Sequence, residues 1–147
     1  MTGMNNHNIQ IEELLKNGFV LRRDFAHYML NDKEITAEEY DELWNRVLIY
    51  LDNNCEKVDE IDYGVEDVWW SRIGLYRCRF GKVGLFMIGA ESHDSIEVYV
   101  GNDAWQKVKN LAIDGIKDKI EWLESSGNEE LINYLHDVLD EIMHMLE

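Results

Sequence analysis

Apolar residues recur at helical spacing through the first third of the chain, and this pattern predicts three helices. The first, residues 9–18, ends at a glycine, and the second, residues 21–30, carries its apolar side chains on one side. At the start of the third, Thr36 and Glu39 fit a capping box. Its apolar face consists of Tyr40, Leu43, Trp44, Val47, Leu48 and Leu51.

The middle of the chain changes to a strand pattern. Aromatic and aliphatic residues fill 67–80 and 83–89, and residues 96–100 alternate between apolar and polar side chains. These segments predict a three-stranded antiparallel meander with a two-residue turn at Gly81-Lys82. Residues 56–63 alternate poorly, so we expect a loop there, with an edge strand as the alternative.

Helical spacing returns near Asn102 or Asp103 and again from Leu131 to Leu146, which predicts two C-terminal helices. Helices followed by strands and then by helices indicate an α+β fold. We expect a single domain over residues 1–147. Its predicted parts are three N-terminal helices in 1–54, a central three-stranded antiparallel meander in 55–101, and two C-terminal helices packed on the meander in 102–147.

The chain is strongly acidic, with a formal net charge of −16. This charge repels nucleic acid and anionic lipid and favours a basic partner. No apolar stretch approaches the ~20 residues of a membrane span, and the N-terminus lacks the pattern of a secretion signal. Cys55 and Cys78 are too few for a disulfide framework. We therefore expect a protein of a reducing cytoplasm, bacterial or that of the host if a phage encodes it.

The charges are distributed unevenly along the chain. From Glu34 to Asp67 there are twelve acidic residues and two basic ones, Arg46 and Lys57. The segment 68–90 contains no acidic residue and four basic ones. Interspersed signs would keep the protein equally soluble, so the separation favours a binding role.

The acidic segment supplies the candidate contact surface. Glu38, Asp41 and Glu42 share one helix face with Cβ atoms about 5–6 Å apart, which makes a row of negative charge like that of a nucleic-acid strand. Two adjacent tryptophans then offer an apolar anchor for a partner. The simpler interpretation is that one of them lies in the core and a helix covers the other. The predicted partner-binding residues are Glu38, Asp41, Glu42, Glu56, Asp59, Glu60, Asp62, Glu66, Asp67, Trp69 and Trp70.

Metal and nucleic-acid sites are poorly supported. Residues 59–62 lack the ligand spacing of a calcium loop. His136, Asp140 and His144 share a face of the last helix, but that face is otherwise the solvent side of an amphipathic helix. The third helix presents carboxylates where a DNA recognition helix needs basic or amide side chains. We predict no metal, no cofactor and no direct binding of nucleic acid.

Catalytic chemistry is also poorly supported. Cys78 lies between Arg77 and Arg79, but neighbours in a strand point to the opposite face, so a buried structural cysteine is expected. Cys55 follows a helix end, where the dipole raises a thiol pKa. His27 and His93 are not linked to a nucleophile by any sequence pattern. We therefore predict no catalytic residue.

The leading hypothesis is a non-enzymatic interaction protein whose acidic face occupies the basic surface of a nuclease or other nucleic-acid-binding protein. Phage inhibitors of host defence such as anti-CRISPR proteins, and immunity proteins against nuclease toxins, share this composition, but no motif links the chain to them. One alternative is a small enzyme or ligand-binding domain with a pocket between sheet and helices, where Arg77 or Arg79 binds an anion. Another is an acidic homodimeric structural subunit with Trp69 or Trp70 at the contact. The oligomeric state stays open.

Overall fold

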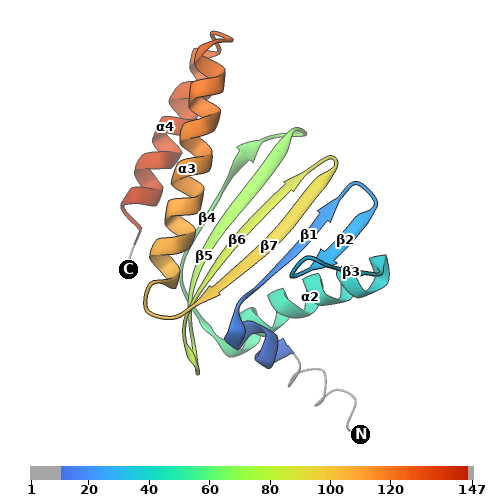
Figure 1. The fold of residues 1–147 in the computed structure, drawn as a ribbon. Coiled ribbons are helices and arrows are strands. Elements are labelled where there is room, and N and C mark those ends of the chain that lie inside the picture. Colours follow the sequence, from blue (N-terminus) through green and yellow to red (C-terminus); the bar gives the residue numbers. More distant parts are fainter. Residues whose placement is uncertain (1–10, 146–147) are drawn as a thin grey trace, which may run out of the picture.

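The computed structural model describes residues 11–145, which form a seven-stranded antiparallel sheet with helices on both faces (Figure 1). The strand order is β3-β2-β1-β7-β6-β5-β4. The strands are β1 (Phe19–Asp24), β2 (His27–Leu30), β3 (Lys33–Ile35), β4 (Glu56–Val65), β5 (Trp69–Cys78), β6 (Gly81–Ala90) and β7 (His93–Val100). The helices are α2 (Ala37–Asn54), α3 (Ala104–Glu124) and α4 (Glu129–Met143), and residues 11–17 are also helical.

The two faces of the sheet bury two separate apolar cores. α3 and α4 cover one face, where Phe86 packs against Trp105 and its neighbours. α2 and residues 11–17 cover part of the other face, around Leu21 and Leu85. Leu85 and Phe86 are adjacent in β6, so the alternation of the strand sends one side chain into each core.

Three hairpins turn at the same end of the sheet. The β1–β2, β4–β5 and β6–β7 turns lie together there, and α2 lies towards the opposite end of its face (Figure 1). This arrangement leaves the turn end of that face without a covering helix among residues 11–145. None of the helices in this part of the chain is long and apolar enough to cross a membrane.

The predicted second helix is wrong, because residues 19–35 form β1, β2 and β3. Phe19 and Leu21 alternate with less buried neighbours, but β1 has only 6 residues, too few to outweigh the helical spacing. The missed signal is Asn31-Asp32, which joins β2 to β3. Both residues have positive φ angles, 51° and 68°. Asn and Asp tolerate that conformation, and two-residue hairpin turns require it.

The predicted three-stranded meander is also wrong. Residues 56–65 form β4, so the segment expected as a loop is the edge strand that was the alternative. Its alternation is poor because several of its polar side chains pair with β5 rather than with solvent. The β5–β6 turn lies at Arg79-Phe80, before the predicted Gly81-Lys82, since Cys78 pairs with Gly81.

The remaining helices lie near their predicted positions. The capping box is confirmed: the Thr36 hydroxyl accepts from the Glu39 backbone at 3.1 Å, and the Glu39 carboxylate accepts from the Thr36 backbone at 3.0 Å. α3 and α4 occupy the two C-terminal segments. The predicted ends at residue 9 and at Leu146 lie outside the described residues.

Cys55 and Cys78 form a disulfide, with their Cα atoms 4.4 Å apart. Cys55 follows α2 and Cys78 ends β5, next to the cross-strand pair Glu56–Arg77. Cys78 is therefore a structural cysteine, as expected, but it is half-buried rather than buried, and its sulfur is bonded to Cys55. The disulfide was not predicted, because with residues 56–63 expected as a loop no strand pairing placed Cys55 beside Cys78.

Candidate functional site

The predicted contact residues of α2 lie on its solvent side. Glu38, Asp41 and Glu42 are exposed, whereas Tyr40 and Val47 face the sheet and are buried. The Glu42 carboxylate is 2.6 Å from the Arg46 guanidinium one turn later. Part of this row of negative charge is therefore compensated on the same helix.

The predicted contact residues of β4 face arginines of β5. The Arg72 guanidinium lies 2.6 Å from the Asp62 carboxylate and 3.8 Å from that of Glu60, and Glu56 lies 3.6 Å from Arg77. Ion pairs within the β4–β5 hairpin thus account for part of the separation of acidic and basic segments along the chain. Only the acids that this hairpin leaves unpaired remain for a partner.

The acids of α2 and those of β4 do not form one continuous row. α2 connects β3 at one edge of the sheet to β4 at the other. At about 1.5 Å of rise per residue, Glu38 lies about 24 Å from the end of α2 where β4 begins. The predicted site therefore divides into an α2 group and a hairpin group.

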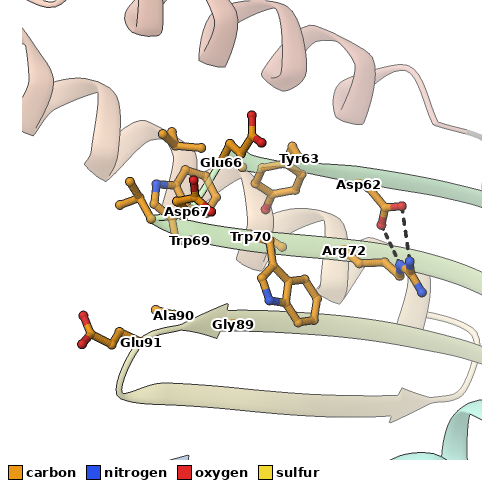
Figure 2. A pocket seen from close by; sticks show the side chains of 14 residues that line it. Asp62, Tyr63, Glu66, Asp67, Trp69, Trp70, Arg72, Gly89, Ala90 and Glu91 are labelled. Atoms are coloured by element: carbon orange, nitrogen blue, oxygen red, sulfur yellow. Dashed lines mark hydrogen bonds and ion pairs between the residues drawn. The ribbon is translucent and has the colours of Figure 1, made fainter.

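Part of the hairpin group lines an open groove of about 610 Å³ at the turn end of the sheet (Figure 2). These residues are Asp62, Glu66, Asp67, Trp69 and Trp70, whereas Glu56, Asp59 and Glu60 are not part of its lining. The β4–β5 turn and the end of β6 form its walls. We call this surface the turn groove. The side chains that define it in the following argument are Asp62, Glu66, Asp67, Trp70, Arg72 and Glu91.

The two tryptophans lie on opposite faces of β5. Trp69 is half-buried against the α3–α4 side, with the Tyr63 ring centroid 5.8 Å away and the Lys119 ammonium 4.5 Å from its own ring. Trp70 lies on the other face and is 43% exposed. Of the two, Trp70 is therefore the one available to a partner, and no helix covers it among the described residues.

Three carboxylates of the turn groove have no counter-charge. Glu66, Asp67 and Glu91 are exposed and form no ion pair within residues 11–145. The single basic residue of the lining, Arg72, is held by Asp62, and this hydrogen bond raises the pKa of the guanidinium above its ordinary value. The groove consequently carries a net negative charge beside an exposed indole.

Arg23 holds the neighbouring turn in place. Its Nε donates to Asp94 Oδ2 at 2.7 Å, its Nη1 to the Phe25 carbonyl at 3.0 Å, and its Nη2 to the Glu91 carbonyl at 3.2 Å. The hydrogen bond to Asp94 raises the pKa of the guanidinium. This residue connects the β1–β2 and β6–β7 turns, and so fixes the backbone that carries Glu91.

The other candidate sites have ordinary surroundings. His136, Asp140 and His144 are exposed, and in the described part of the chain no group of three or more His, Cys, Asp or Glu is placed to hold a metal ion. Arg77 lies beside the Trp105 ring at 5.1 Å, and Arg79 is paired with Glu12. Both arginines proposed for an anionic ligand are therefore already engaged.

No protein family, curated protein or solved structure matches this chain. The site must accordingly be judged on its own residues. Sequence reasoning missed Glu91, Arg72 and Arg23 as parts of it. The order of strands brings these residues together, and only the basic character of 68–90 signalled that β5 would meet the acids.

Proposed function

We propose that this protein is a non-enzymatic inhibitor or regulator that occupies the basic, nucleic-acid-binding surface of a partner protein. The observation that carries the proposal is the turn groove, whose lining contains the exposed Trp70 and three carboxylates that form no ion pair within residues 11–145. A nuclease or another nucleic-acid-binding protein presents the complementary surface. Anti-defence proteins of phages or mobile elements and nuclease immunity proteins are the functional classes that fit this description.

Charge and apolar contact would contribute to the proposed binding in different ways. The net charge of −16 accelerates encounter with a basic surface and orients it. Tryptophan is enriched among the residues that dominate binding energy, and Trp70 stands at the charged groove rather than in the core. Carboxylates elsewhere in the same groove take the place of the phosphates that the partner ordinarily binds.

The α2 group is a second contact region under this proposal. Glu38 and Asp41 are exposed near the start of α2, whereas the turn groove lies at the far end of β4, so the two regions are separate contacts. Binding through both regions would require a partner that spans the sheet, because α2 begins after edge strand β3 and the turn groove includes β4 at the other edge. The two regions can be tested separately because they share no residue.

We also propose that the protein acts in a cytoplasm, bacterial or that of an infected host. Glutathione and thioredoxin hold cysteines there as thiols. The Cys55–Cys78 disulfide instead favours an oxidising compartment, so the state of this pair tests the location.

The test is affinity capture from the native host at low and high salt, followed by mass spectrometry. Three charge-reversal baits are compared with the natural chain: E66K/D67K/E91K in the turn groove, E38K/D41K/E42K on α2, and D137K/D140K/E141K on the exposed side of α4. Each bait changes the net charge equally. We expect a basic, nucleic-acid-binding protein that is captured by the natural chain and the α4 variant and lost by the turn-groove variant. Capture that all baits share would contradict the proposal.

A further inference from the structure

The β1–β2 turn places a phenylalanine where glycine is the favoured residue. The turn consists of Phe25 and Ala26, between the ends of β1 and β2. Phe25 has a φ angle of 54°, and the φ angle of Ala26 is not positive. A two-residue hairpin turn with a positive φ angle at its first residue favours glycine there, because a side chain at that position is crowded by the backbone. Phe25 therefore occupies a strained backbone position.

This strain is not compensated by the surroundings of the ring. The other non-glycine residues with positive φ angles among residues 11–145 are Asn31, Asp32 and Asp67. Asn and Asp tolerate this conformation because their short polar side chains can form local hydrogen bonds, which phenylalanine cannot do. Phe25 is also 67% exposed, so it gains little from burial. Backbone strain of this kind is typical of functional positions.

Contacts with the neighbouring β6–β7 turn fix Phe25 in place. Its backbone N–H donates to the Ser92 carbonyl at 2.7 Å, and its own carbonyl accepts from Arg23 Nη1 at 3.0 Å. The phenyl ring meets the His93 imidazole edge-on, with the two ring centroids 5.3 Å apart. A side chain that is already ordered loses little conformational entropy when it binds. The exposed ring is therefore preorganised for contact with a partner.

The same contacts connect Phe25 to the turn groove. Arg23 also donates to the carbonyl of Glu91, a residue of the groove lining, at 3.2 Å. The β1–β2 turn lies at the same end of the sheet as the β4–β5 and β6–β7 turns (Figure 1). β1 and β5 are separated by β7 and β6, which at the usual strand spacing is about 14 Å. A protein interface of ordinary size, about 800 Å² per partner, is wide enough to cover both Phe25 and the groove.

We infer that Phe25 is a fixed anchor that inserts into an apolar pocket of the basic partner, beside the surface that meets the turn groove. An exposed aromatic ring that fills a pocket of a partner is the usual form of a binding hot spot. A lipid surface matches less well, because the net charge of −16 repels anionic membranes. This inference rests on the proposed function and adds to it a second feature that the partner must present.

The variant F25N tests whether the ring serves binding or the fold. Asparagine tolerates a positive φ angle and removes the aromatic ring. We expect the urea midpoint of F25N to equal or exceed that of the natural chain, with an unchanged circular dichroism spectrum. A lower midpoint would show that the ring stabilises the fold, and it would overturn the inference.

Binding is tested by replacing Phe25 with the photo-reactive residue benzoylphenylalanine in the full chain and irradiating it in extract of the native host. We expect crosslinks to an apolar segment of a basic protein, mapped by mass spectrometry. That protein is then purified, and its binding to the natural chain, F25N and W122A is measured by surface plasmon resonance. F25N should bind at least about tenfold more weakly, mainly through faster dissociation. W122A is the matched control and should bind normally, because Trp122 is 71% exposed on α3, away from the turn.

The outcomes separate this inference from the proposed function. No crosslink from position 25, or equal affinity of F25N and the natural chain, overturns the anchor. Sedimentation of the natural chain but not of F25N with phosphatidylcholine vesicles also overturns it, because the ring would then serve a membrane. If F25N weakens binding to a crosslinked protein that does not bind nucleic acid, the anchor stands and the proposed function falls. If E66K/D67K/E91K loses a basic partner that F25N binds with full affinity, the proposed function stands and the anchor falls.

Discussion

Cys55 and Cys78 join the end of α2 to the end of β5 through a disulfide with a sequence separation of 23. The bond closes a loop that contains β4, most of β5 and the β4–β5 turn of the groove. Closing a loop of this length lowers the entropy of the unfolded chain and stabilises the fold by about 3 kcal/mol. We expect C55S/C78S, or reduction of the natural chain, to lower the free energy of unfolding by that amount in urea denaturation.

The redox state of Cys55 and Cys78 in cells also tests the cellular compartment in which the protein acts. If the protein acts in a reducing cytoplasm, rapid thiol trapping followed by mass spectrometry should find both cysteines reduced in cells. A disulfide trapped in cells would contradict the cytoplasmic location. C55S/C78S remains the control, since it cannot change mass on reduction.

Gly89 and Trp70 should be energetically coupled. An added methyl group at Gly89 overlaps the indole, so we expect G89A to cost about 1–2 kcal/mol in the free energy of unfolding as the ring is displaced. In a W70A background the same substitution should be nearly neutral. Chemical denaturation of the double-mutant cycle measures this coupling, and additive effects would contradict the close approach of the indole to Gly89.

Gly115 provides the matched glycine. It is exposed in α3, and an added Cβ atom there meets nothing within 4 Å. Alanine has the higher helix propensity, so G115A should stabilise the protein by about 0.5–1 kcal/mol in the same denaturation experiment. A loss of stability would contradict the helical, uncrowded position of this residue.

Buried tyrosines should make the fold sensitive to alkali. Burial, aided by the negative charges of Glu60 and Asp52, raises the pKa of Tyr76 from 10.0 to about 12. Between these values the unfolded chain has released the phenolic proton and the folded chain retains it. The stabilising contribution is therefore complete below pH 10 and lost as the pH rises to about 12, at about 1.4 kcal/mol per pH unit.

Urea denaturation at a series of alkaline pH values tests this dependence, with tyrosinate absorbance as a second signal. We expect Y76F to flatten the fall in stability between pH 10 and about 12. An unchanged slope in Y76F would show that Tyr76 titrates normally. Other tyrosines with raised pKa values, such as Tyr63, account for the slope that remains.

The sequence predicted the elements whose pattern is long and local. α2 has a capping box at Thr36 and an apolar face along 18 residues, and α3 and α4 have comparable faces. β1, β2 and β3 could not be recognised in the same way, because strands of 6, 4 and 3 residues carry too little alternation. β1 is held in the sheet by pairing with β7, which is distant in sequence, and β2 and β3 extend the sheet from β1.

The candidate site was predicted only in part, for a related reason. All the acidic residues of Glu56–Asp67 were expected to face a partner. Instead, Glu56 and Asp62 form ion pairs with arginines of the neighbouring strand β5. Which acids remain unpaired depends on strand register. The exposure of Trp70 rather than Trp69 likewise depends on which face α3 and α4 cover, a tertiary choice that alternation alone does not determine.

The most direct test of the central claim is competition between this protein and nucleic acid for the captured partner. Fluorescence anisotropy of labelled nucleic acid bound to the partner would be followed as the natural chain, the turn-groove variant or the α4 variant is added. We predict displacement by the natural chain and by D137K/D140K/E141K, and none by E66K/D67K/E91K. A ternary complex, in which the partner holds both the protein and the nucleic acid, would contradict the account.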